Sequence, residues 1–267
     1  MVEQMEQSTL YNARLDTWSL NHFTGDHLGD LSQKFTPDGG AKAFYGLTVV
    51  AFIESESLLH KKICDFQNKI AAALESAGVG HVFSMLEPLS FHMTICDIVA
   101  GSAPLEPAKL LDIVEAGRRL FPKLGMDSKL SCQLTGLGVD MSLVLLAEFE
   151  SDASLKQCLH LEKQLKKGFQ VDERSFLGHV SLAYFVQQPG TQLNRIKQVL
   201  APFSEEALGE FNFNKISLCH FSDMNTYTPL ISFDLLDRSF EHHPNNLHTF
   251  MPATESLQEN HESLSED

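Results

Sequence analysis

The chain has 267 residues, 43% of them hydrophobic, which suffices for one large domain or two small ones around a packed core. Its 35 acidic and 20 basic residues give a formal net charge of −15, which opposes binding to the phosphate backbone of a long duplex. The sequence shows no secretory signal and no apolar run near the ~20 residues of a membrane span. Five cysteines without a CxxC pair are typical of reduced thiols. We therefore expect a cytoplasmic protein that binds neither a membrane nor long duplex nucleic acid.

The first third of the chain predicts an arm, a strand and a helix. Residues 1–39 show no sustained hydrophobic period and end near a strong turn signal, so we expect an N-terminal arm that packs on the body. Residues 44–53 are rich in β-branched and aromatic residues and predict a buried strand. Apolar residues spaced by threes and fours over 58–77 predict a helix that Gly78 ends.

The rest of the domain, taken to residue 236, predicts a second set of strands and helices. The expected elements are strands at 82–86 and 91–99, a helix between Pro107 and Pro122, a hairpin over 129–149 around residues 136–138, a helix from Asp152 to Gly168, a strand at 176–186, a short helix over 193–200, and strands at 211–221 and 230–235. Beyond residue 236 the apolar period stops and acidic residues dominate, so residues 237–267 are expected to form a mostly disordered tail.

Two halves of the chain have the same order of expected strands and helices. Strand 44–53, helix 58–77 and strand 90–99 correspond to strand 141–149, helix 153–167 and strand 177–186. This order predicts two βαβ-like lobes around a pseudo-two-fold cleft.

Each lobe carries the same short motif on its last strand. The two copies are His92-Met93-Thr94-Ile95 and His179-Val180-Ser181-Leu182. Because side chains alternate along a strand, the histidine and hydroxyl of each copy point to the same side. The pattern His-x-Ser/Thr alone is weak, since five histidines fit it: His22, His92, His179, His220 and His261. A core histidine bonded to a neighbouring hydroxyl is the alternative for either copy alone, and the pairing in echoing lobes favours a site.

The chemistry of the paired motifs fits cleavage of a phosphate ester. Two imidazoles can act as general base and general acid near neutral pH, since the unperturbed pKa is ~6.5. The hydroxyls of Thr94 and Ser181 would donate to the non-bridging oxygens of the phosphate. This scheme requires no metal and no other cofactor, and two imidazoles fall short of the ligand set that zinc usually has.

The sequence gives weaker support for further residues around the site. Tyr45, Tyr184 and Tyr227 are expected as substrate contacts, although simple alternation would place Tyr184 on the face opposite His179. Cys96 would share the face of His92, where we interpret it as a buried thiol rather than a nucleophile.

With these motifs the sequence resembles the 2H phosphoesterase superfamily, which includes LigT-like RNA cyclic phosphodiesterases, over roughly residues 40–236. Residues 34–39, 46–50 and 90–94 are similar to an uncharacterised bacterial and fungal subgroup. The resemblance implies an α+β, bilobal, pseudo-symmetric fold in which two antiparallel-rich sheets form a central cleft with helices outside. It also implies His92 and His179 as catalytic residues and Thr94 and Ser181 as phosphate-binding residues.

The activity that the resemblance implies is metal-independent hydrolysis of a 2′,3′-type cyclic phosphate or a 2′–5′ bond, with His179 as base and His92 as acid in roles that can exchange. The chain lacks a basic strip beside the motifs, which favours a small nucleotide-like phosphate ester or a short RNA end. Two alternatives stay open. One is a non-catalytic nucleotide- or phosphate-binding protein whose acidic tail engages a protein partner, and the other is a metal-dependent hydrolase.

Overall fold

The computed structural model describes residues 2–26, 28–124, 126, 128–172, 177–248 and 250. The helices are α1 (Val2–Thr17), α2 (Leu58–Ser76), α3 (Pro107–Leu120), α4 (Asp152–Phe169), α5 (Leu193–Leu200) and α6 (Pro244–His248). The strands are β1 (Tyr45–Phe52), β2 (Phe83–Met85), β3 (His92–Gly101), β4 (Ser131–Val139), β5 (Ser142–Glu148), β6 (His179–Phe185), β7 (Ala207–Asn212), β8 (Lys215–Phe221), β9 (Tyr227–Asp234) and β10 (Phe240–His242). None of the helices in these ranges is long and apolar enough to cross a membrane.

The strands form an antiparallel path in the order β10-β9-β8-β1-β3-β6-β5-β4-β7, with β2 paired to β6. The two expected sheets are the halves of this path. Their junction lies between β3 and β6, where the paired residues are Met93 and Val180. The expected α+β fold with two antiparallel halves is confirmed, and the junction joins the two motif strands directly.

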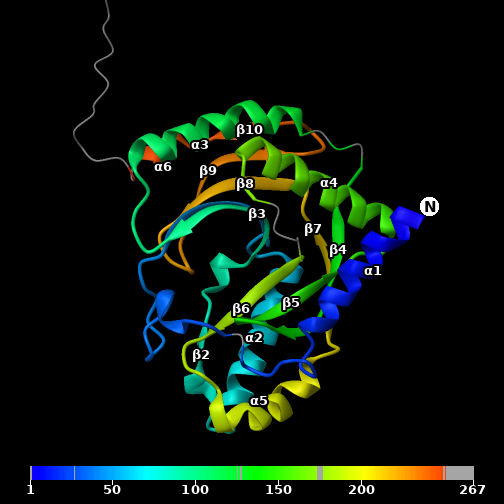
Figure 1. The fold of residues 1–267 in the computed structure, drawn as a ribbon, viewed down its shortest axis with the longest axis vertical. Coiled ribbons are helices and arrows are strands. Elements are labelled where there is room, and N and C mark those ends of the chain that lie inside the picture. The colour runs from blue at the N-terminus through cyan, green and yellow to red at the C-terminus, as the bar shows by residue number, and fades with distance from the viewer. Residues whose placement is uncertain are drawn as a thin grey trace, which may run out of the picture.

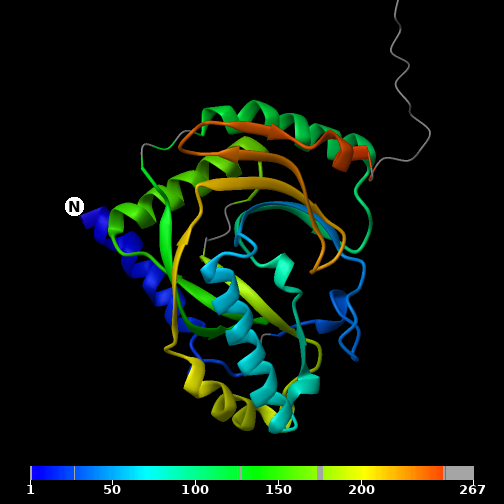
Figure 2. The same cartoon turned by 180° about the vertical axis from the view of Figure 1, so that it is seen from behind.

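Helices cover the outer side of both halves (Figure 1). Gly117 of α3 lies against Leu218 and Ile231, where an added Cβ would come within 3.1 and 3.3 Å of their side chains. Helix α4 packs on α3 and β3, whereas α2 and α5 pack on each other below the other half, as Figure 2 shows from behind. The hydrophobic core therefore lies between the strands and these helices, which leaves the inner faces of the motif strands for polar side chains.

The N-terminal arm contains a helix, α1, that the sequence pattern did not predict. Its anchor is Tyr11, which is 3% exposed and donates a hydrogen bond to the carbonyl oxygen of Ala147 at 2.7 Å. The hydroxyl of Tyr11 also accepts the N–H of Gly178 at 3.3 Å. Among the side chains of α1 that the structure describes, Tyr11 is the one that is fully buried, so the described part of the helix shows no long apolar stripe.

Three other expectations were wrong in detail. The β4–β5 turn lies at residues 140–141 rather than at 136–138, because Gly136 adopts φ +62 inside β4, where strand pairing shifts register. The single strand expected over 211–221 is two strands, because the chain turns at Asn214, whose side chain accepts the N–H of Leu130. The tail does not begin at residue 237, since β10 pairs with β9 and α6 follows it. Residues 251–267 of the expected tail lie outside the described residues.

Candidate functional site

The two motif histidines are held in the same way. His92 Nδ1 lies 2.6 Å from the carbonyl oxygen of Ser90, and His179 Nδ1 lies 2.8 Å from that of Leu177. A carbonyl oxygen only accepts, so each Nδ1 carries a proton and donates it. Each ring therefore presents Nε2, which is the atom available for proton transfer.

The junction between the lobes brings the four motif side chains together. Antiparallel pairing of Met93 with Val180 implies, when extended by one residue each way, that His92 lies opposite Ser181 and Thr94 opposite His179. All four side chains then occupy the face opposite Met93 and Val180. Cross-strand neighbours in such a pair have Cβ atoms roughly 5 Å apart, close enough to contact one small substrate.

The hydroxyls of Thr94 and Ser181 accompany the histidines and are half-buried. Within the described ranges, neither hydroxyl has a hydrogen-bond partner in the protein. Both are therefore available to donate to a bound anion.

A β-bulge in each motif strand changes which residues follow the histidines on the inner face. On β3, Val50 pairs with Thr94 and Val49 with Cys96, so Ile95 is the extra residue. On β6, Val144 pairs with Ser181 and Leu143 with Ala183, so Leu182 is the extra residue.

These bulges move Asp97 and Tyr184, each five residues after its histidine, onto the inner face. Tyr184 was expected on the face of the strand that His179 does not occupy, and this was wrong. Cys96 was expected on the same face as His92, and this was also wrong. Cys96 is 2% exposed, and burial raises the pKa of its thiol to about 12.

Asp97 is an acidic residue of the site that the sequence reasoning missed. The hydroxyl of Thr48, which is 2% exposed, donates to Asp97 Oδ1 at 3.2 Å and so orients the carboxylate. The negative charge of Asp97 favours the protonated forms of both motif histidines. Strict alternation hid this residue, because only the bulge at Ile95 places it beside them.

The three tyrosines expected as substrate contacts have different positions. The ring of Tyr227 lies 4.3 Å from that of His92, centroid to centroid, so Tyr227 is part of the site. Tyr184 reaches the site through the bulge at Leu182. Tyr45 does not, since its ring lies on the outer face of β1 beside His220, at a centroid distance of 6.5 Å.

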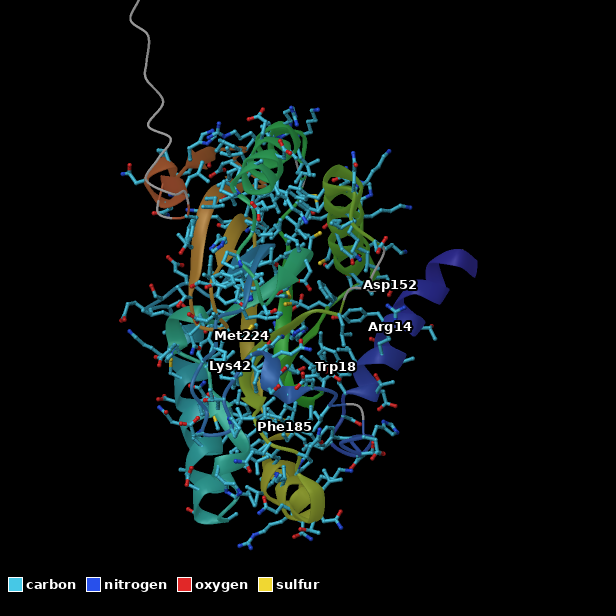
Figure 3. The ribbon with its side chains drawn as sticks, turned by 60° about the vertical axis from the view of Figure 1, so that its left-hand side comes forward. Arg14, Trp18, Lys42, Asp152, Phe185 and Met224 are labelled. Atoms are coloured by element: carbon cyan, nitrogen blue, oxygen red, sulfur yellow. The ribbon has the colours of Figure 1, made fainter. Side chains whose placement is uncertain are left out.

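The N-terminal arm supplies two further residues that the motif search did not identify. The ring of Trp18 packs edge-on against His179 with a centroid distance of 4.9 Å. Figure 3 shows Trp18 beyond the C-terminal end of α1, on the side of the strands. Lys34 Nζ lies 4.7 Å from the centroid of the Tyr184 ring. No sequence signal links these positions to the histidines, because only the folded arm brings them there.

Burial dominates the electrostatics of the two histidines. Burial lowers the pKa of His92 to about 4, and a positive charge on His179 lowers it further. The hydrogen bond that His92 donates to the Ser90 carbonyl and the charge of Asp97 oppose this shift. Burial also lowers the pKa of His179, opposed by the hydrogen bond to Leu177 and by the carboxylates of Asp97 and Asp140. These two carboxylates favour the protonated form of His179.

Among the residues that the structure describes, no three histidine, cysteine, aspartate or glutamate side chains are arranged to hold a metal ion. All five cysteines are free thiols, as expected.

Comparison with known proteins supports the same reading of the first motif. Residues 34–104 match the family model described as "2H-phosphodiest: Domain of unknown function (DUF1868)". This segment includes His92 and Thr94, whereas the second motif lies outside it. No curated protein gives a significant sequence match.

Several solved structures are similar to this chain at low sequence identity. A conserved protein of unknown function from Agrobacterium tumefaciens is 19% identical, with a TM-score of 0.56, over 81% of this chain and 97% of that one. TT0787 of Thermus thermophilus is 16% identical, with a TM-score of 0.47, over 71% of this chain and 97% of the other. Escherichia coli LigT, solved with NADP+, is 13% identical, with a TM-score of 0.46, over 72% and 98% of the two chains. The Agrobacterium protein has the same fold as this chain.

Proposed function

We propose that this chain is a 2H phosphoesterase, as the family match over residues 34–104 supports, and that it hydrolyses a small cyclic phosphodiester of the 2′,3′-cyclic nucleotide type, or a 2′–5′ phosphodiester, by two-histidine acid–base catalysis. The observation that carries this proposal is that His92 and His179 make equivalent hydrogen bonds. Both rings donate Nδ1–H to a carbonyl two residues upstream and present Nε2 on one face of the β3–β6 junction.

In the proposed reaction, one histidine activates the attacking water and the other protonates the leaving oxygen. The pKa of His92, about 4, keeps this ring neutral over most of the pH range and suits it to the role of base. The carboxylates of Asp97 and Asp140 favour the protonated form of His179, which suits it to the role of acid. This assignment in the free protein is the reverse of the one expected from the resemblance.

The hydroxyls of Thr94 and Ser181 stabilise the charge on the phosphate in this proposal. Donors aimed at the non-bridging oxygens contribute most where charge is redistributed in the transition state. Trp18 and Tyr227 pack against the two imidazoles and limit their access to water. Such exclusion strengthens each interaction with the bound phosphate.

Turnover of nucleoside 2′,3′-cyclic phosphates and 2′–5′-linked dinucleotides in the presence of EDTA tests the proposal. His92→Gln and His179→Gln are each expected to reduce kcat at least about a hundredfold, as for the loss of a general acid or base. His22→Gln is the matched control, because His22 starts the same His-x-Thr pattern on the exposed arm, and it should retain wild-type activity.

Full activity of both motif variants would disprove the site. Tight nucleotide binding without any turnover would instead support the non-catalytic alternative. Loss of activity in EDTA with rescue by zinc would support a metal-dependent hydrolase.

A further inference from the structure

Lys34 is a half-buried lysine whose ammonium group lies at the edge of the candidate site. Its Nζ lies 4.7 Å from the ring centroid of Tyr184 and 5.5 Å from that of Phe44. An ammonium group is attracted to the face of an aromatic ring, and these contacts hold it in place. Its positive charge also reaches His179, where it favours the neutral imidazole.

The surroundings of Lys34 leave its charge available for a ligand. Within the described part of the chain, five other lysines form ion pairs with carboxylates: Lys61, Lys69, Lys129, Lys166 and Lys215. Lys34 forms no such pair with a described residue, although the chain carries a formal net charge of −15. An ammonium group has three donors, and two aromatic contacts leave N–H groups for an anion.

A small pocket adjoins this lysine. Lys34, Phe35, Met141 and Tyr184 line it together with Asp30, Leu31, Gln33 and Phe185. The carboxylate of Asp30 already accepts hydrogen bonds from the N–H and hydroxyl of Ser32, at 2.9 and 2.6 Å. Lys34 is therefore the group in this pocket that can neutralise an incoming anion.

The equivalent position in the other lobe has the opposite charge. Asp97 and Tyr184 each lie five residues after a motif histidine and reach the inner face through equivalent bulges. One position presents a carboxylate, and the other presents a ring that carries the ammonium group of Lys34. A substrate with a second anionic group would be repelled on the side of Asp97 and attracted on the side of Lys34.

We propose, resting on the function proposed above, that Lys34 Nζ binds a second phosphate group of the substrate. The preferred substrate class is then a nucleoside cyclic phosphate that carries a further phosphate at its other end, such as a 5′-phosphate. Lys34 is a specificity residue in this scheme, and Asp97 sets the direction in which the substrate lies between the two histidines.

Binding of two product-like probes, measured by calorimetry, tests this inference without relying on turnover. The probes are adenosine 3′-monophosphate and adenosine 3′,5′-bisphosphate. The wild-type protein should bind the bisphosphate about tenfold more tightly, as a charge-assisted contact predicts. Lys34→Met keeps the apolar stem, and it should abolish this preference while changing monophosphate affinity less than about twofold. Lys34→Arg should retain the preference, and the control Lys42→Met, at an exposed lysine eight residues further along the chain, should match wild type.

Equal wild-type affinity for the two probes, or equal weakening of both by Lys34→Met, would overturn the subsite. The affinities of the wild-type protein for the two probes test the subsite even where a variant fails to fold. With 2′,3′-cyclic AMP and its 5′-phosphorylated form, Lys34→Met should raise KM about tenfold for the second substrate alone. A preference that depends on Lys34 in a protein with no turnover would refute the phosphodiesterase proposal and keep the subsite.

Discussion

The hydroxyl of Tyr11 connects helix α1 to the second motif strand, and its removal tests how the arm supports the site. In Tyr11→Phe, the carbonyl of Ala147 loses a donor at 2.7 Å and the N–H of Gly178 loses an acceptor at 3.3 Å. The tyrosine is 3% exposed, so water has little access to the two backbone groups. Gly178 directly precedes His179, and the change should therefore reach the imidazole.

The expected cost follows from these two contacts. Each hydrogen bond contributes about 1 kcal/mol, and a buried group that stays unpaired costs about 1–3 kcal/mol. We therefore expect Tyr11→Phe to lower the free energy of unfolding by about 2 kcal/mol, and by no more than about 5 kcal/mol. Phenylalanine fills the same space apart from the hydroxyl, so a cavity adds little.

Urea denaturation followed by tryptophan fluorescence measures this loss. Trp18 is the only tryptophan of the chain and packs against His179, so its emission reports on the arm and on the site together. Tyr45→Phe is the matched control, because the hydroxyl of Tyr45 has no hydrogen bond to any described residue, and it should change stability by less than about 0.5 kcal/mol. An equally small effect of Tyr11→Phe would refute the reasoning.

Two further predictions concern pH and a buried ion pair. The proposed reaction needs neutral His92, which exists above its pKa of about 4, and protonated His179, which exists below a pKa lowered from 6.5. The ratio kcat/KM should therefore fall as pH drops through about 4 and fall again as pH rises to neutrality and above, and an increase through pH ~8 in a stopped-flow profile would contradict the assignment. Lys166→Met removes the cationic partner of Glu162 in a pair whose side chains are 9% and 11% exposed, and it should destabilise by about 3 kcal/mol in thermal unfolding. The double variant with Glu162→Gln should lose less, and an equal or greater loss would show that the pair contributes little.

Much of the fold could be predicted because long apolar patterns dictate it. The helix expected over 58–77 is α2, and the strand expected over 44–53 is β1. The motif histidines were found because their residue type and local strand pattern are visible in sequence. That they lie close together was predicted from the strand–helix–strand order that the two lobes share, and the structure places them at the Met93–Val180 junction.

The remainder of the site depends on features that carry no simple periodic signal. One extra residue at Ile95 and another at Leu182 reverse the face of the residues that directly follow them, which exposes Asp97 and Tyr184 to the site. Trp18 comes from a segment whose contacts span more than 100 residues of sequence, so only tertiary packing determines its position.

The matched hydrogen bonds of His92 and His179 have a consequence for how a catalytic cycle would close. Each turnover would move one proton onto the base and take one from the acid. At the end of the reaction the former base would be protonated and the former acid would be neutral. Because both rings keep their Nδ1 proton on a backbone carbonyl, only the Nε2 protons differ between the two states. Neither ring needs to rotate or change tautomer, and one proton exchanged through solvent restores the starting state.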